Sequence, residues 1–314
     1  MDVDLLLDLC AVPPRAEPRI FLYAILFSMR RSVQIKGVAI LALLMLTLCI
    51  WYAVIQEDRR GLLTVSFLDI GQGDAIFIEA PSGRQVLIDG GKGTSVLRQL
   101  SSVIPWYDKT IDVVVGTHPD QDHIGGLVEV LRRYRVSLIV KSSVLDTKGT
   151  DFIAFEKAIA EERSAEVLEA RRGTILDLGG GAYIEILFPD RKISTVETNT
   201  GSIVTRLVYG DTAFMLTGDS PDEIENYLMT LDRENLKSNV LKAGHHGSKT
   251  SSSPLFLGFV APEYGVYSRG CDNSYGHPAP ETVATFARFQ IPTLDTCLEG
   301  TITFVSDGQT MARK

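Results

Sequence analysis

The apolar residues of this chain form three kinds of run, and each kind predicts a different element. Val38 to Ile55 is a run of eighteen residues without a charge, about the minimum length for a helix that spans a bilayer. After residue 60, short runs rich in Val, Ile, Leu and Phe are separated by glycine-rich or Pro-Ser-Gly turns, which predicts strands. Apolar residues at helical spacing lie between these runs and predict amphipathic helices.

The order of these elements indicates the fold class. Strands are predicted at 63–68, 75–79, 85–88, 111–115, 183–187, 203–208, 213–216 and 239–242, and helices at 124–134, at 152–162 and from 280 onward. Helices and strands that interleave in this way around two sheets predict an α/β protein with a four-layer αβ/βα sandwich. In that architecture, we expect a functional site along the edge where the two halves meet.

The apolar run near the N-terminus predicts a membrane anchor. Arg30, Arg31 and Lys36 precede it, so the positive-inside rule places the N-terminus in the cytoplasm, although Arg59 and Arg60 follow it and weaken that orientation. A cleaved signal peptide and a buried helix are the alternative interpretations. The predicted organisation is a cytoplasmic tail at 1–37, a transmembrane helix at 38–55 and a domain at 61–314 on the extracytoplasmic side of a bacterial cell envelope.

Composition and charge restrict the functions of the domain. The chain has 314 residues, of which 45% are hydrophobic, which is enough for one large core. After residue 60 there are 24 Lys and Arg against 33 Asp and Glu, a net charge of −9, which argues against a broad nucleic-acid-binding face. Cys271 and Cys297 are the cysteines of the domain, where export would permit a disulfide. No Cys-x-x-Cys spacing occurs, so a cysteine-based zinc site is not expected.

The densest chemistry lies in T-H-P-D-Q-D-H-I-G, residues 117–125, just after a predicted buried strand. His118, Asp120, Asp122 and His123 place two imidazoles and two carboxylates within six residues. Alternation along an extended segment lets the first three face one side while His123 reaches a second point, so the loop has the groups to hold two metals. The alternative is turn punctuation with helix-capping acids.

Two further acids end predicted strands. Asp219 is followed by Ser220, Pro221 and Glu223, which predict a helix with a serine N-cap and a capping box that holds the acid rigidly. Asp89 precedes two glycines and either orients a ligand histidine or belongs to turn chemistry.

The remaining histidines also lie in glycine-flanked stretches. His245 and His246 are adjacent and point in different directions, so we choose His246 as a metal ligand, and His245 either coordinates or binds substrate. His277 is a candidate ligand or general acid, with capping or packing as the alternative. Ser248 and Lys249 add a hydroxyl and a cation suited to an anionic phosphoryl group, and Lys242 is a second cation close enough in sequence to receive phosphate.

Taken together, these motifs resemble the metallo-β-lactamase fold hydrolases. His118 to His123 match the family signature H-x-H-x-D-H with aspartate at the second position. The resemblance is specific to the hydrolase domain of ComEC-type competence proteins and extends from about residue 62 to the C-terminus. It rests on the stretches F-L-D-I-G-Q-G-D-A, L-I-D-G-G, L-T-G-D, L-K-A-G-H-H-G-S-K-T-S-S-S and Y-G-H-P.

The resemblance implies a ligand set and a metal. It makes His118, Asp120, Asp122, His123, Asp219 and His246 the metal ligands, with Asp219 bridging two divalent ions and with Asp122 and His277 as catalytic groups. The family's usual additional histidine is missing, since none occurs between residues 124 and 244, and Asn199, Thr200 and Ser202 occupy the neighbourhood. Asn199 is therefore a further candidate substrate contact. More oxygen in the ligand set shifts the expected metal from strict Zn²⁺ towards Mn²⁺.

The leading functional hypothesis is a phosphodiesterase or nuclease that uses metal-activated water on DNA, including single strands, or on a related phosphodiester. The alternatives are hydrolysis of another ester, such as a phosphocholine ester, or of a lactam, and a non-catalytic binding domain. The resemblance also implies a role in DNA uptake. Because the residues before the domain are too few for the polytopic channel of ComEC-type proteins, we expect a separate membrane channel as partner.

Overall fold

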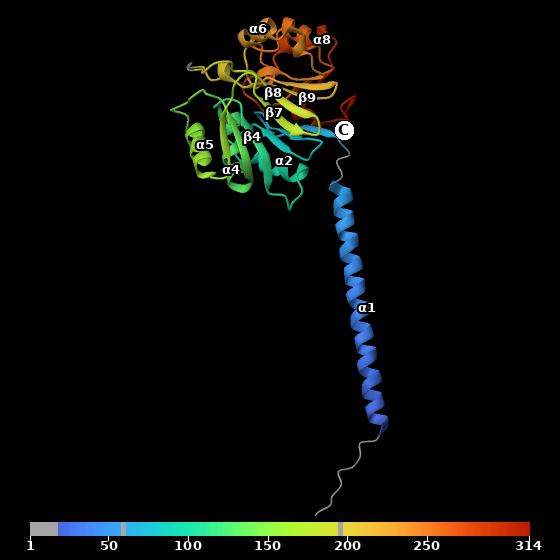
Figure 1. Cartoon of the computed structure of the whole chain (residues 1–314). Helices are drawn as coiled ribbons and strands as arrows, with labels where there is room; N and C mark the ends of the chain where they lie inside the picture. The colour runs from blue at the N-terminus through green and yellow to red at the C-terminus, as the bar shows by residue number, and fades with distance from the viewer. Residues whose placement is uncertain (1–17, 58–60, 194–196) are drawn as a thin grey trace, which may run out of the picture. The chain divides into compact units, whose positions relative to one another are not determined.

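The computed structural model describes residues 18–57, 61–193 and 197–314. Residues 1–17 of the expected tail, together with Arg59 and Arg60, lie outside the described residues. The chain divides into two units, Met1–Asp58 and Arg59–Lys314. Figure 1 shows the elements of each unit.

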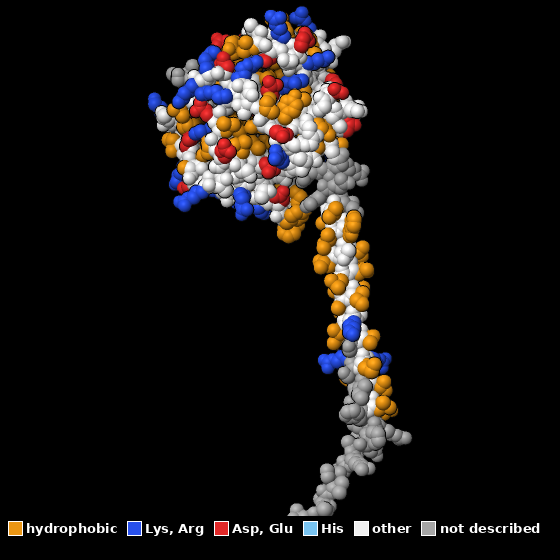
Figure 2. All heavy atoms as spheres, viewed as in Figure 1, with side chains coloured by type: hydrophobic (Ala, Val, Ile, Leu, Met, Phe, Trp, Pro, Cys, Tyr) orange, Lys and Arg blue, Asp and Glu red, His pale blue; other side chains and the backbone are white. Residues whose placement is uncertain are grey.

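The first unit contains one long helix, α1 (Pro18–Glu57). Its stretch Met29–Val54 is long and apolar enough to cross a membrane, with a mean hydropathy of 2.4. Exposed apolar side chains cover most of the visible face of the helix between residues 38 and 54 in Figure 2. The structure thus has one N-terminal candidate membrane span, consistent with the predicted single transmembrane helix.

The first sheet of the second unit has eight strands and carries the central sequence motif. Its order is β15-β14-β1-β2-β3-β4-β5-β6. The neighbours from β3 to β6 run parallel, and the others pair antiparallel. The strands are β1 (Leu63–Phe67), β2 (Ile76–Glu79), β3 (Gln85–Ile88), β4 (Thr110–Gly116), β5 (Arg135–Lys141), β6 (Glu166–Glu169), β14 (Ile302–Ser306) and β15 (Met311–Arg313).

The second sheet has seven strands in the order β13-β12-β11-β10-β9-β8-β7. The neighbours from β10 to β13 run parallel, and those from β7 to β10 antiparallel. The strands are β7 (Ile175–Gly179), β8 (Ala182–Phe188), β9 (Val204–Tyr209), β10 (Thr212–Leu216), β11 (Val240–Lys242), β12 (Tyr264–Tyr267) and β13 (Thr293–Asp295).

Helices cover the outer face of each sheet, as Figure 1 shows for α2, α4 and α5 on one side and α6 and α8 on the other. The sheets face one another across a core that includes Phe67, Phe214 and Phe304, and separate cores lie under the two helix layers. The predicted four-layer sandwich is therefore confirmed.

The helices of the second unit are α2 (Ser95–Val103), α3 (Gln121–Ile124), α4 (Leu127–Arg133), α5 (Thr150–Glu161), α6 (Asp222–Leu231), α7 (Pro254–Val260), α8 (Pro280–Arg288) and α9 (Thr296–Glu299). Short 3-10 turns are η1 (Asn199–Gly201), η2 (Arg233–Leu236) and η3 (Gly244–Gly247).

Two local predictions are wrong. The helix expected at 124–134 is interrupted after Ile124, so that α3 and α4 are separate. A Cβ on Gly126 would lie 2.0 Å from the carbonyl oxygen of Gly90, so this interruption lets two chain segments approach closely. The capping box after Asp219 does not form, because Pro221 occupies the N-cap position of α6 and no side chain caps it.

A disulfide joins Cys271, which follows β12, to Cys297 in α9, with the two Cα atoms 5.1 Å apart. It ties the loop that leads to His277 to the edge of the second sheet. Disulfides persist in oxidising compartments, a property that bears on the location of the domain.

Candidate metal centre

The predicted site residues gather at the carboxyl ends of parallel strands from both sheets. His118, Asp120 and Asp122 follow β4 of the first sheet, and Asp219 follows β10 of the second. His246 follows β11, the parallel neighbour of β10. Because parallel strands end at the same edge, residues far apart in sequence meet there. These side chains therefore gather at one edge, where the sequence analysis expected a site.

Three histidines present the same ring nitrogen to the centre. His123 Nδ1 donates to Asp89 Oδ2 at 2.7 Å, and His246 Nδ1 donates to the carbonyl oxygen of Ser268 at 2.8 Å. A carboxylate and a carbonyl can only accept, so each Nδ1 carries its proton, and in the neutral ring Nε2 keeps a lone pair. These two Nε2 atoms lie 3.3 Å apart, so their lone pairs require a shared cation or a proton between them.

The third histidine, His118, follows the same logic through Thr117. The Thr117 hydroxyl donates to Asp89 Oδ2 at 2.7 Å and lies 3.0 Å from His118 Nδ1. Having given its one proton to Asp89, the hydroxyl accepts from Nδ1. Nε2 of His118 is buried without a hydrogen-bond partner among the described residues. A buried, unpartnered lone pair of this kind fits a metal ligand.

Asp219 is the point on which these nitrogens converge. Its Oδ2 lies 3.2 Å from His123 Nε2, 3.3 Å from His246 Nε2 and 4.0 Å from His118 Nε2. The carboxylate is 3% exposed. Burial opposes its charge, but His123, His246 and Lys242 outweigh that effect and hold the pKa of Asp219 well below its usual value. One ionised oxygen facing three lone pairs is a donor set suited to divalent metal.

The two histidines nearest Asp219 have their own pKa values displaced. Burial would lower the pKa of His123, but Asp219 and Asp89 raise it well above the usual value. Asp219 and Asp74 do the same for His246. Protons therefore compete with a metal for these nitrogens, and metal binding would displace them.

Asp120 and Asp122 lie at the outer side of the cluster. Asp120 Oδ2 is 3.7 Å from His118 Nε2, and Asp122 Oδ2 is 3.5 Å from His246 Nε2. Burial works against their charge, but the neighbouring imidazoles outweigh it, because His118 lowers the pKa of Asp120, and His246 and His123 lower the pKa of Asp122. Both acids are thus ionised beside the histidines, where carboxylate ligands would be needed.

Asp74 is a site residue to which the sequence analysis gave no role. One ligand atom from each of Asp74, His123, Asp219 and His246 lies within 4.8 Å of all the others. However, Asp74 Oδ1 lies 3.3 Å from Nδ1 of His246, not from Nε2. Because that nitrogen carries the proton, we assign Asp74 an orienting role behind the histidines rather than direct coordination. Its place at the end of G-Q-G-D in the family motif was the available signal.

Lys242 corrects another expectation. It is fully buried, and its Nζ lies 2.6 Å from Asp74 Oδ2, 3.3 Å from Asp219 Oδ1 and 2.7 Å from the Gly218 carbonyl. Lys242 therefore cannot receive a substrate phosphate, because its donors are committed inside the fold. Together with His246, it holds the pKa of Asp74 at about 2 despite burial.

Backbone conformation places these groups. His245 and His246 both have positive φ, 47° and 56°, an uncommon conformation that turns the chain so sharply that two adjacent rings enter the same site. Gly73 has a φ of 122°, and a Cβ there would lie 2.0 Å from the Asp122 carbonyl oxygen. Only glycine permits this approach, which brings the Asp74 turn against the metal-binding loop.

The remaining predicted residues surround this cluster at greater distance. His245 Nε2 is 3.6 Å from Asp219 Oδ2, and the His277 ring centre is 5.6 Å from that of His245. Ser248 is buried and Lys249 exposed. Asn199 begins η1, a turn that follows Thr198, whose side chain hydrogen-bonds to Asp120. The segment at 198–202 thus borders the site, although it supplies no histidine.

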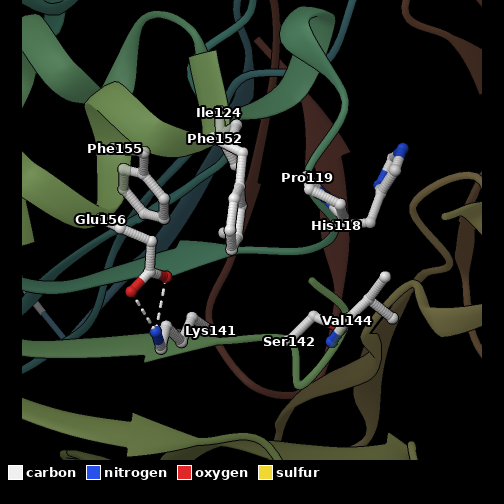
Figure 3. A pocket seen from close by; sticks show the side chains of 10 residues that line it. His118, Pro119, Ile124, Lys141, Ser142, Val144, Phe152, Phe155 and Glu156 are labelled. Atoms are coloured by element: carbon white, nitrogen blue, oxygen red, sulfur yellow. Dashed lines mark hydrogen bonds and ion pairs between the residues drawn. The ribbon is translucent and has the colours of Figure 1, made fainter. Parts of the chain in front are cut away.

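A narrow crevice beside His118 is not a substrate pocket in this conformation. Its volume is about 10 Å³, roughly the space of one water molecule. Figure 3 shows the ion pair of Lys141 with Glu156 near Phe155 on one side of it, while the His118 ring points away from them. A substrate would therefore approach from the side of Asp120, Asp122 and His245, whose side chains are 37%, 17% and 29% exposed.

Comparison with known proteins agrees with this geometry. Residues 68–270 match the family model of the metallo-beta-lactamase superfamily. The chain is 31% identical over 264 residues to ComE operon protein 3 of Bacillus subtilis, covering 76% of this chain and 32% of that protein. It is 30% identical over 244 residues to competence protein ComA of Neisseria gonorrhoeae, covering 76% of this chain and 32% of that protein. The chain thus spans about a third of the length of these relatives.

Solved structures support the fold. CmlA, described as a diiron beta-hydroxylase from Streptomyces venezuelae, aligns with a TM-score of 0.52 at 13% identity, covering 80% of this chain and 54% of that chain. Such low identity speaks to architecture alone. The family match extends from the end of β1 past β12 and includes every strand end that carries a histidine of the cluster. The chain therefore belongs to the metallo-beta-lactamase superfamily.

Proposed function

We propose that this chain is a metal-dependent phosphodiesterase that acts on DNA, preferentially single-stranded or short, or on a related phosphodiester. The observation that carries the proposal is the convergence of the Nε2 atoms of His118, His123 and His246 on Asp219 Oδ2. When bound there, two divalent ions would activate water and neutralise charge on a phosphoryl group. The ionised acids Asp120 and Asp122 complete an oxygen-rich donor set that suits Mn²⁺ as well as Zn²⁺.

The chain's own residues assist at the open side. Burial lowers the pKa values of His245 and His277, so both rings are neutral near pH 7 and can each donate one N–H to a phosphoryl oxygen. Asp122 remains ionised and can accept a hydrogen bond from water to orient it. A neutral His277 acts as general acid only after gaining a proton, which the approach of an anionic substrate favours.

Charge supports a restricted class of substrate. The net charge of −9 after residue 60 repels a long duplex over most of the surface. Lys242 is committed to Asp74 and Asp219, which leaves Lys249 as the cation of the predicted phosphate contacts. We therefore expect short or single-stranded ends to be cleaved in preference to long duplexes. The relatives named for competence support DNA as the source of the phosphodiester.

Location and partners extend the proposal. The charge bias on the N-terminal side of the apolar run Val38–Ile55, where Arg30, Arg31 and Lys36 lie within α1, favours a membrane-anchored hydrolase on the extracytoplasmic side of the cell envelope. The disulfide between Cys271 and Cys297 also supports the extracytoplasmic side, because disulfides persist in oxidising compartments. A separate membrane channel would then supply the route for the remaining DNA strand.

An activity screen with added metal tests the function. The protein, stripped of metal and reloaded with Mn²⁺ or Zn²⁺, is offered bis-p-nitrophenyl phosphate, single-stranded and double-stranded DNA, a phosphocholine ester and a cephalosporin. We expect cleavage of the first substrate and of short single strands, with slow, salt-inhibited action on plasmid. Rapid, salt-insensitive plasmid digestion contradicts the charge argument. Hydrolysis of the cephalosporin or phosphocholine ester alone moves the function to an alternative enzyme, and metal binding with no turnover favours a binding domain.

A further inference from the structure

An exposed aromatic pair lies in the loop between α2 and β4, remote from the metal centre. Trp106 is 84% exposed, the highest value for a large hydrophobic side chain in the described part of the chain, and Tyr107 is 53% exposed. Their rings meet edge to face, 5.9 Å apart. Figure 2 shows an apolar projection on the second unit where this loop leaves α2 in Figure 1. Tryptophan is rarely left so exposed on a monomeric soluble surface unless it serves an interaction.

A basic hollow lies close to this pair in the sequence and the fold. It has a volume of about 440 Å³ and is lined by Leu97, Ser101, Lys109, Arg133 and Tyr134. Two of these five are cationic and none is acidic. Lys109 Nζ lies 5.7 Å from the centre of the Tyr134 ring. The hollow therefore offers the cations of Lys109 and Arg133 and the hydroxyl of Tyr134 to an anionic group. This local positive charge lies on a protein whose net charge is negative.

Two acids lie close in sequence to the lining of the hollow. Asp108 accepts from Gln85 Nε2 and from the backbone N–H of Thr110, and burial and the charge of Asp108 raise the pKa of Tyr134. Glu129 pairs with Arg132. Lys109 and Arg133 are the charged residues of the lining itself.

The hollow is distinct from the metal centre. β4 runs from Thr110, next to Lys109, to Gly116, next to the metal-binding loop. Its seven residues span about 20 Å at roughly 3.3 Å per residue. A ligand in the hollow would therefore leave the catalytic edge free.

A short tether joins the second unit to the candidate membrane span. The candidate membrane span ends at Val54 and β1 begins at Leu63. The nine residue steps between them reach at most about 30 Å, even fully extended. The second unit is thus held beside the bilayer, where headgroups have a high effective concentration and even weak contacts are populated.

We propose that Trp106, Tyr107, Lys109 and Arg133, together called the Trp106 surface, dock on the anionic headgroups of the membrane that α1 spans. Tryptophan and tyrosine prefer the membrane–water interface because their rings are apolar at one end and polar at the other. The two cations bind headgroup phosphates, and apolar insertion adds to that attraction. Docking of this surface would hold the metal centre about one strand length from the bilayer, open to substrate.

Fluorescence of the full chain tests the proposal. The sequence has two tryptophans, Trp51 in α1 and Trp106, so Trp51→Phe leaves Trp106 as the reporter. This variant is reconstituted into vesicles of phosphatidylcholine with or without phosphatidylglycerol, each with brominated acyl chains. We expect a blue shift and loss of Trp106 fluorescence in brominated phosphatidylglycerol vesicles. Emission that stays red and unquenched there would overturn the proposal.

Matched charge reversals separate headgroup recognition from other causes. In the same background, Lys109→Glu with Arg133→Glu should lower the ratio of docked to free Trp106 at least about tenfold, since each cation near an anionic surface contributes roughly fivefold. Arg288→Glu on α8, in the helix layer of the other sheet, should change nothing. Equal quenching in pure phosphatidylcholine, or in the double variant, would overturn the anionic site.

The same reporter distinguishes a nucleic-acid surface, because bases also stack on tryptophan. A short single-stranded oligonucleotide is added to vesicles without bromine. No change in Trp106 emission supports a lipid surface, and saturable quenching by the oligonucleotide overturns it. Unfolding temperatures of all variants are compared with that of Trp51→Phe. If the double variant fails to fold, Arg133→Gln alone serves, with a smaller loss of quenching expected.

Discussion

Two regions of the candidate metal centre hold their charges in different ways. The floor consists of Asp74, His123, Asp219, Lys242 and His246, all buried. The rim consists of Asp120, Asp122, His245, Lys249 and His277, which are partly or largely exposed. In the floor, Lys242 and His246 place cationic or proton-carrying atoms within 3.3 Å of Asp74 or Asp219. In the rim, water and substrate can provide the compensation.

This difference separates two tasks. A buried charge must be paired, because burial without a partner costs several kcal/mol, so the floor can hold only one arrangement of its groups. The rim is under no such constraint and can therefore exchange ligands. We infer that the floor fixes where a metal sits and the rim determines what reaches it.

The largest effect is expected for Asp219→Ala. Removing the carboxylate on which three Nε2 atoms converge should release metal and remove several kcal/mol of transition-state stabilisation, about 1000-fold in turnover. Asp222→Ala, three residues later and exposed in the first turn of α6, is the matched control and should change neither. Metal content and phosphodiesterase rate are measured on both. Equal losses in the two variants would remove Asp219 from the site.

Lys242→Met should destabilise the metal-free protein by about 3–5 kcal/mol, because it leaves Asp74 and Asp219 buried without their cation. Added Zn²⁺ or Mn²⁺ should restore part of this free energy of unfolding, since a cation between the histidines and Asp219 replaces some of the lost charge. Denaturant unfolding with and without metal measures both quantities. A loss that metal leaves unchanged would mean that Lys242 serves packing alone.

Asp89→Asn tests the hydrogen bonds that orient His123 behind the metal centre. Asp89 accepts from His123 Nδ1 and from both the hydroxyl and the backbone N–H of Thr117. Loss of such an orienting carboxylate typically costs about 10–100-fold in metal affinity or activity. Metal titration should show this decrease while the unfolding temperature of the metal-free protein changes little. Unaltered affinity would show that the Nδ1 contact does not set the orientation of His123.

The smallest effect concerns pH and a buried acid beside the site. Glu225 accepts from the backbone N–H groups of Ser252 and Ser253 at 2.5 Å and 2.9 Å, and burial raises its pKa to about 7. A raised pKa means that the folded protein holds the proton longer than the unfolded chain does. Stability from this group is therefore full below about pH 4.5 and is lost as pH rises towards 7, by up to about 1.4 kcal/mol per pH unit. Glu225→Gln should flatten that dependence in unfolding measurements, and an unchanged slope would contradict the assignment.

The sequence predicted the fold more completely than it predicted the contacts within the floor of the metal centre. Alternation and turn residues located the strands around Ile111 and Val204 because those signals are local. The clustering of His118, Asp122 and Asp219 could also be predicted, because strand ends and the family motifs place them at one edge. The role of Lys242 could not be predicted, since a lysine inside an apolar strand gives no sign of the acids that it will meet.

Local cooperation between segments explains the other errors. The capping box after Asp219 failed because Pro221, not Ser220, lies at the N-cap of α6, and the backbone N–H of Asp222 donates to the carbonyl of Thr250 instead. The helix at 124–134 is interrupted because Gly126 packs against Gly90. Both outcomes depend on contacts between segments far apart in the sequence, which no local pattern encodes.

The position of bound metal tests the central claim most directly. Crystals of the second unit grown with Zn²⁺ or Mn²⁺ would be analysed by anomalous diffraction above and below the metal absorption edge. We predict anomalous peaks bonded to Nε2 of His118, His123 and His246 at about 2.0–2.2 Å, with Asp219 between them and Lys242 still on Asp74. A peak bonded to an Nδ1 atom, a peak outside this cluster, or no peak at saturating metal would contradict the account.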